Sequence, residues 1–432
     1  MIVKILLTVF YLLLFNFLIY RYKLFQFKNF SPFITHVVFN LKFAVGIFIW
    51  LIYTFYYKEL QNNDIHKFYS DALILRDIAK ENPKAFLQLL TIDDGSVPEY
   101  TLRMKNWERN FDEAPINENR TVIRLNALLM FLSFKTYFVH ILFFCFISLV
   151  GWILLTNVVF GFIDTRNSIL ALPVLLLPSV LFWTSGVMKE PLLAFGLGLL
   201  FHGIANSEMR IPKLTAIVTG GFIVLLTKFF VLVCLFPALV AFLFFRKTEK
   251  IGLIVLKYIL VNTILLLMAF NIHQVVPRVN LQQMLLNKQM NSIKEANYFQ
   301  AGSRIELPEL KEDAISILKT SVIGIWNTIT RPYIWEGENV MMLASAIENV
   351  FIISLLLMCI SFTNWKNLNN LNLFLFLLNF SFLYFALIGM CTPVLGNLVR
   401  YKTPLLPLFL FAFMIQVSPK MVIGNLSFLL RK

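Results

Sequence analysis

Two aspartates head the set of residues that could do chemistry in this sequence. Asp64 and Asp71 lie seven residues apart in the stretch 63–77 (NDIHKFYSDALILRD), shortly after an apolar run. On a helix this spacing places both carboxylates on one face, about two turns apart. A carboxylate in this position could act as a general base or bind a metal ion, and His66 is close enough to join it. The alternative is the solvated start of a loop.

A polar break and a lone lysine interrupt later apolar runs. In the stretch 178–191 (PSVLFWTSGVMKEP), Pro191 fits the first turn of a helix. The residues before it therefore present backbone N–H groups that favour an anion, and Lys189 and Glu190 add a cation and a carboxylate. Lys228 interrupts the apolar run 214–245, where its ammonium could hold a phosphate. The alternatives are a tight helical hairpin at the break and a snorkelling side chain for Lys228.

Two late stretches, 330–349 and 396–407, complete the set of candidates. Arginine suits bidentate recognition of phosphate, and aromatic faces suit sugar rings. The alternative is a belt of aromatic and basic residues at a membrane interface. The candidate binding residues here are Arg331, Trp335, Glu336, Arg400 and Lys402.

Composition indicates that membrane helices must position these residues. The chain has 432 residues, of which 58% are hydrophobic and only 14% are charged, too few to cover the surface of a soluble domain. We therefore expect an all-α polytopic membrane protein with about eleven transmembrane helices. The expected spans are 3–20, 33–57, 137–159, 168–184, 191–206, 213–227, 229–245, 251–272, 342–362, 371–391 and 403–418.

The basic residues indicate the orientation of these spans. With the N-terminus outside and the C-terminus inside, the cytoplasmic segments hold 14 Lys and Arg against three acidic residues. The outer segments then hold 20 basic and 21 acidic residues, so the net charge of +14 sets topology and does not predict a nucleic-acid partner. We expect a single membrane domain over 1–432 with two long extracytoplasmic loops, 58–121 and 273–341. Amphipathic helices are expected at 71–90 and 121–134.

This orientation places all the candidate residues on one side of the membrane. The cytoplasmic connections are short and plain, and the sequence carries no Walker loop, H-E-x-x-H or G-x-S-x-G motif. Carboxylates and cations from five separate segments meeting at one face would suit an enzyme that acts on a phosphate-bearing membrane lipid.

The combination resembles the GT-C superfamily of membrane glycosyltransferases. The residues that carry the resemblance are Trp183 to Glu190 (WTSGVMKE) and Arg400 to Pro404 (RYKTP), which are similar to motifs of poorly characterised bacterial, mannosyltransferase-like members. The resemblance implies a GT-C-like fold in a bacterial-type inner membrane and a role in polysaccharide biosynthesis of the cell envelope. It implies a polyprenyl-phosphate-linked sugar as donor and a glycan, lipid or protein as acceptor, with the active site on the extracytoplasmic face.

The resemblance also implies roles for individual residues. Asp64 or Asp71 would deprotonate the acceptor hydroxyl, and Lys228 and Arg400 would hold the lipid phosphate. The sequence leaves open whether a divalent metal takes part, which sugar is transferred and whether the chain forms oligomers. Three other functions stay open: a polysaccharide polymerase or ligase of the O-antigen type that relies on outer-loop arginines, a transporter or flippase, and a structural membrane subunit.

Overall fold

The chain folds as an assembly of helices. The computed structural model describes residues 2–57, 63–91, 96–109, 116–163, 167–205, 210–244, 251–276, 280–365, 368 and 370–417. Within these ranges there is no β-strand, and two isolated bridges join Arg304 to Val394 and Thr363 to Val417. Parts of both long loops (58–62, 92–95, 110–115 and 277–279) lie outside the described residues. So do parts of several connections that the sequence predicts to be cytoplasmic (164–166, 206–209, 245–250, 366–367, 369 and 418–432).

Six helices among the described residues are long and apolar enough to cross a membrane, so this is a multi-pass membrane protein by length and composition. Helix α7 is 78% buried inside the protein, whereas α1 and α13 are each 11% buried and expose their apolar side chains, as lipid-facing helices do. The six are α1 (Ile2–Arg21), α2 (Pro32–Leu51, continued by the π-helix η2, Ile52–Tyr56), α7 (Tyr137–Phe160), α13 (Ile251–Val275), α16 (Val340–Ser361) and α17 (Leu371–Cys391).

The remaining expected spans coincide with shorter apolar helices, and the expected total of about eleven stays a prediction. Pro178 begins a new helix where the span 168–184 was expected, so that region holds two short helices after a 3₁₀ turn. The shorter apolar helices are α8 (Ala171–Leu175, after η3, Asn167–Leu170), α9 (Pro178–Trp183), α10 (Lys189–Ala205), α11 (Arg210–Thr227), α12 (Phe229–Phe244) and α19 (Leu406–Met414).

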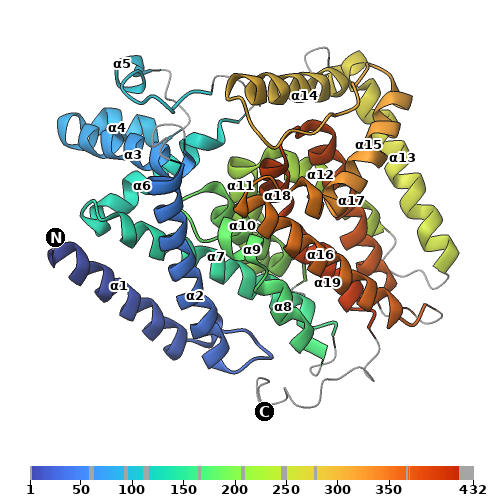
Figure 1. Ribbon diagram of the computed structural model, residues 1–432, viewed down its shortest axis with the longest axis horizontal. Helices are drawn as coiled ribbons and strands as arrows, with labels where there is room; N and C mark the ends of the chain where they lie inside the picture. Colours follow the sequence, from blue (N-terminus) through green and yellow to red (C-terminus); the bar gives the residue numbers. More distant parts are fainter. Residues whose placement is uncertain are drawn as a thin grey trace.

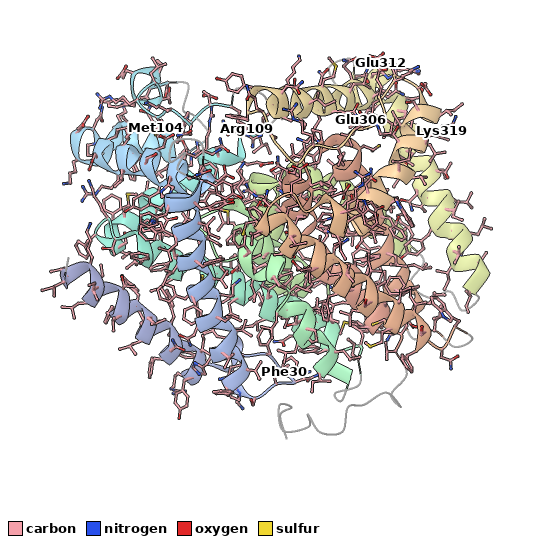
Figure 2. All side chains as sticks on the ribbon, in the orientation of Figure 1. Phe30, Met104, Arg109, Glu306, Glu312 and Lys319 are labelled. Carbon is pink, nitrogen blue, oxygen red and sulfur yellow. The ribbon has the colours of Figure 1, made fainter. Side chains whose placement is uncertain are left out.

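Several polar helices gather at one end of the molecule, which we call the polar end. Figure 1 shows α3, α4, α5 and α14 at this end, in the upper part of the view, together with the last turn of α2. In Figure 2 the labelled side chains of Arg109, Glu306 and Glu312 lie at the same end, and Phe30 lies at the opposite one. The remaining helices are α3 (Asp64–Glu81), α4 (Pro83–Leu90), α5 (Pro98–Thr101), α6 (Glu118–Ser133), α14 (Leu281–Tyr298), α15 (Ala314–Thr330) and α18 (Leu395–Lys402), with 3₁₀ turns η1 (Lys23–Phe25) and η4 (Ile334–Glu336).

The helix expected over 71–90 is split in two by proline. Pro83 has no N–H to donate and disfavours helical backbone at the residue before it, so α3 ends at Glu81. Asn82 adopts extended backbone, and its side chain accepts a hydrogen bond from the N–H of Ala85, which caps α4. The helix expected over 121–134 is present as α6, which begins three residues earlier, at Glu118.

Glycine permits the close packing of α7 against α10, the helix that carries Lys189 and Glu190. A Cβ atom on Gly198 would lie 2.7 Å from the Cα of Gly151, and a Cβ on Gly151 would lie 2.5 Å from the Cα of Phe195. Small residues at such crossings let membrane helices approach through their backbones. The contact therefore fixes the depth and direction of α10.

We predict that Gly198→Ala destabilises the protein, because the added methyl group has no space and must push α7 and α10 apart. Overpacking of this kind costs about 1–3 kcal/mol. The thermal unfolding temperature in detergent measures the effect. Gly221→Ala is the matched control in α11, since nothing lies within 4 Å of its added Cβ. Equal unfolding temperatures for the two variants would contradict the prediction.

Candidate functional site

A cavity of about 540 Å³ lies among the ends of several helices. Its walls come from η2, α3, α6, α10, α12, α14, α17 and α18, from the segment 105–109, and from Lys228 between α11 and α12. Apolar side chains at the end of α17 and on α12 form one part of the wall. The charged lining residues are seven basic and five acidic: Lys67, Lys105, Arg109, Lys189, Lys228, Lys288 and Arg400, with Asp64, Glu108, Glu118, Glu190 and Glu295.

Arg400 joins two carboxylates from distant parts of the chain. Its Nε and Nη2 donate hydrogen bonds to Oε1 and Oε2 of Glu190 at 2.7 and 3.0 Å. Its Nη1 lies 2.6 Å from Oδ2 of Asp64. Glu190 is fully buried, and Asp64 and Arg400 each expose less than a fifth of their side-chain surface. The planar fork of the guanidinium therefore ties α3, α10 and α18 together in a poorly solvated place.

Asp64 is the first residue of α3 and is held as a charged carboxylate. Lys67, one turn later on the same helix, places its ammonium 2.6 Å from Oδ1. Burial by itself raises the pKa of Asp64, but the nearby Lys67 and Arg400 outweigh it and hold the pKa well below its usual range. Asp64 is therefore ionised throughout the physiological pH range.

The break between α9 and α10 places Lys189 and Glu190 at the cavity, and the buried Lys42 of α2 supports it. The ammonium of Lys42 donates hydrogen bonds to the backbone oxygen of Thr184 at 2.9 Å and to its hydroxyl at 2.6 Å. Ser148 of α7 donates to the same backbone oxygen at 2.7 Å. These bonds satisfy a carbonyl that the helix end leaves without a partner. A lysine within an expected span signals such a role, and sequence reasoning did not use it.

Lys228 brings an ammonium group with unused hydrogen-bonding capacity to the cavity. Its Nζ lies 4.0 Å from Oε1 of Glu190 and 4.1 Å from the centre of the Tyr401 ring. Among the described residues it has no hydrogen-bond acceptor within bonding distance, and only 12% of its side-chain surface is exposed. Burial lowers the pKa of Lys228 to about 8, although the charge of Glu190 opposes this effect. An anion in the cavity would therefore find an available donor here.

A second group of charges lies beside the first in the same cavity. Glu118, the first residue of α6, accepts a hydrogen bond from the ammonium of Lys189 at 3.1 Å. Arg109 lies 3.2 Å from the same carboxylate oxygen. The two sequence-adjacent residues Lys189 and Glu190 thus pair with different helices, since Lys189 pairs with α6 and Glu190 with α18.

The structure brings five of the ten sequence-predicted residues to the cavity, and the other five lie outside its lining. Asp71 is 2% exposed and accepts hydrogen bonds from the backbone N–H and side chain of Asn106, at 2.7 and 3.4 Å. Burial raises the pKa of Asp71, and the hydrogen bonds from Asn106 oppose this. Its observed role is to anchor the segment 105–107 to α3. The five that line the cavity are Asp64, Lys189, Glu190, Lys228 and Arg400.

The remaining predicted residues serve the structure around η4. Arg331 lies 3.3 Å from Glu336, and Trp335 is 81% exposed and stacks on Tyr333. Lys402 is buried and donates hydrogen bonds to the backbone oxygens of Thr328 and Arg331 and to the side chain of Asn349. The bonds to Thr328 and Asn349 link α18 to α15 and α16.

Sequence reasoning missed the cavity residues of α6 and α14. Lys288, Asn291, Ser292 and Glu295 follow the spacing i, i+3, i+4, i+7, which places them on one face of α14. That pattern of polar residues was the available signal. Among the described residues, no group of three or more His, Cys, Asp or Glu could hold a metal ion.

Comparison of the chain with protein families, with curated proteins and with solved structures finds no match. The fold and the cavity therefore define the class of protein only as a multi-pass α-helical membrane protein with a charged cavity.

Proposed function

We propose that the protein is a membrane glycosyltransferase that moves a sugar from a polyprenyl-phosphate donor to an acceptor hydroxyl. The observation that carries the proposal is the presence of two groups in one cavity of a membrane helix assembly. Asp64 supplies an ionised carboxylate, and Lys228 supplies an ammonium without a hydrogen bond. The carboxylate can take the proton of the acceptor hydroxyl, and the ammonium can bind the phosphate of the donor. These are the two groups that such a transfer requires.

The charge of the cavity supports a phosphate as ligand. Its lining has two more basic than acidic side chains, and Lys228 has N–H donors to spare. Arg400 already donates two hydrogen bonds to Glu190 and forms an ion pair with Asp64. Lys228 is therefore the better assigned phosphate ligand, and Arg400 is the residue that orders the site. A bound phosphate would also raise the pKa of Lys228 and keep its ammonium charged.

Asp64 is the residue we assign as the base. In the proposed step, the acceptor oxygen forms a bond to the anomeric carbon while its proton passes to a carboxylate oxygen of Asp64. The bond between the anomeric carbon and the phosphate oxygen breaks, and its electron pair leaves on the phosphate, where Lys228 stabilises the negative charge. A phosphate that interacts with Arg400 or Lys67 weakens their hold on Asp64 and raises its pKa towards that of a working base.

The apolar part of the cavity wall suits a lipid-linked donor. Leu387 and Ile388 belong to the last two turns of α17, a helix long enough to cross the membrane, and Phe230 belongs to α12. A phosphate at Lys228 would therefore have apolar surface beside it for the first prenyl units.

The two motifs behind the GT-C resemblance meet in the structure. Glu190 ends the first motif and Arg400 begins the second, and their side chains form the bidentate pair. Their contact brings both motifs into one site, as a GT-C-like glycosyltransferase would use them. Arg331, one of the two arginines on which the O-antigen-type alternative relies, lies outside the cavity lining, although Arg109 of the segment 105–109 lies within it. We further propose the bacterial-type inner membrane as location, with the N-terminus and the cavity on the extracytoplasmic side, and a role in envelope polysaccharide synthesis.

We predict that Lys228→Met weakens binding of undecaprenyl phosphate by about tenfold or more, since a charge-assisted hydrogen bond contributes about 1.5–3 kcal/mol. Native mass spectrometry of the purified protein can measure the affinity, and undecaprenol serves as the uncharged lipid. Lys319→Met, at an exposed site of α15 in the upper part of Figure 2, is the matched control and should bind as wild type does. Equal loss of affinity for undecaprenol, or no loss at all, would contradict the phosphate assignment.

We predict that Asp64→Asn abolishes sugar transfer, because the amide cannot accept the proton. Undecaprenyl phosphate should bind at least as tightly as to wild type, because the variant removes a negative charge from the cavity. Asp71→Asn should retain transfer, since Asp71 lies outside the cavity lining and the amide oxygen can still accept the bond from Asn106. Release of polyprenyl phosphate from a panel of polyprenyl-phosphate sugars, in vesicles containing bacterial envelope glycans, measures transfer. An active Asp64→Asn enzyme would overturn the assignment of the base.

A further inference from the structure

Helix α14 contributes both neutral polar and charged side chains to the cavity lining. Figure 1 shows it lying across the upper end of the view, over the region of α12, α17 and α18. The face formed by Lys288, Asn291, Ser292 and Glu295 lines the cavity. This face carries one positive and one negative charge, so it adds no net charge with which to hold a second phosphate.

Two of these side chains and one on α18 have hydrogen-bonding groups without a partner. The amide of Asn291, the hydroxyl of Ser292 and the amide of Asn397 form no hydrogen bond with any other residue that the structure describes. Asn291 and Ser292 are half-buried, so their groups are only partly solvated, whereas Asn397 is exposed. Asn397 precedes Arg400 by one helical turn and therefore shares its face of α18.

The position of α14 is fixed by a buried glutamine on a neighbouring face. The side-chain N–H₂ of Gln289 donates to the backbone oxygens of Met390 and Pro308 at 2.8 and 3.0 Å, and its oxygen accepts from the N–H of Leu310 at 3.1 Å. The bond to Met390 joins α14 to the end of α17, which lines the cavity, and the other two join α14 to the segment 308–310. The unpartnered polar groups are therefore held in place before any ligand arrives.

Two backbone hydrogen bonds connect this wall to α18. Ile305 donates to the oxygen of Pro393 at 2.8 Å, and Leu395 donates to the oxygen of Ser303 at 2.9 Å. The segment after α14 is thus paired with the segment that starts α18. The pairing sets the position of Asn397 relative to Asn291 and Ser292.

We propose that Asn291, Ser292 and Asn397 bind the hydroxyl groups of a sugar in the cavity. Amides and hydroxyls can both donate and accept, as a neutral polyhydroxyl ligand requires, whereas Lys228 carries the charge that suits a phosphate. The proposal rests on the proposed function for the source of the sugar, which is either the lipid-linked donor or the acceptor glycan. Either way, these three residues determine which sugar the site accepts.

The test compares three kinds of probe on the full-length protein in nanodiscs: undecaprenyl phosphate, undecaprenyl phosphate carrying mannose, glucose or arabinose, and the free methyl glycosides. The variants are Asn291→Ala with Ser292→Ala, and Asn397→Ala. Gln282→Ala removes an amide of the same helix outside the cavity lining and is the matched control. Alanine is favourable in a helix, so the variants should fold.

For a donor sugar, we expect wild type to bind one sugar-bearing lipid more tightly than bare undecaprenyl phosphate. The affinity of the double variant for this sugar-bearing lipid should fall about tenfold, which is the effect of losing two neutral hydrogen bonds. Its affinity for bare undecaprenyl phosphate should equal that of wild type. For an acceptor sugar, the loss should appear with a methyl glycoside. Unchanged affinity of all the variants for every probe would overturn the proposal, as would a wild type that gains nothing from any sugar.

Failure of the proposed function has a different signature. It would appear as wild-type protein that does not bind undecaprenyl phosphate, or that binds it equally well after Lys228→Met. Loss of methyl glycoside binding in the double variant would still support a sugar site in that case.

Discussion

The structure around the cavity depends on the pairing of Arg400 with Glu190 and Asp64. Each of these groups is costly to bury alone, and the three become compatible with their surroundings only because the guanidinium contacts both carboxylates. The pairing joins α3, α10 and α18, which are far apart in the sequence. It also keeps Asp64 ionised and leaves the Lys228 ammonium 4.0 Å from Glu190, without a hydrogen bond to it. The proposed transfer uses both the ionised carboxylate of Asp64 and the ammonium of Lys228.

The membrane helices explain why such a charged group can persist. Close glycine contacts fix α10 against α7, and the buried Lys42 satisfies the carbonyl at the break before α10. The break allows two consecutive residues, Lys189 and Glu190, to reach different partners. Rigid apolar packing therefore supports the polar site, and the break before α10 sets the positions of Lys189 and Glu190 within it.

Much of the polar site could be anticipated from single residues, since an ionisable group next to an apolar run is costly and easy to notice. Asp64, Lys189, Glu190, Lys228 and Arg400 were found in this way. The sequence could not predict which charged or polar side chains pair with one another. Nothing in it indicates that Arg400 pairs with Glu190, or that Asp71 accepts a hydrogen bond from Asn106. The length of the helix expected over 168–184 was overestimated for a different reason. The apolar run continues across Pro178, which begins a new helix.

The central claim is that the cavity binds the phosphate of a lipid-linked sugar at Lys228. A cryo-electron microscopy structure of the full chain in nanodiscs with undecaprenyl phosphate tests it most directly. The account predicts density for the phosphate within hydrogen-bonding distance of the Lys228 ammonium, with the prenyl chain against the end of α17. An empty cavity, or phosphate density at the surface beside Arg331 and Trp335, would contradict it.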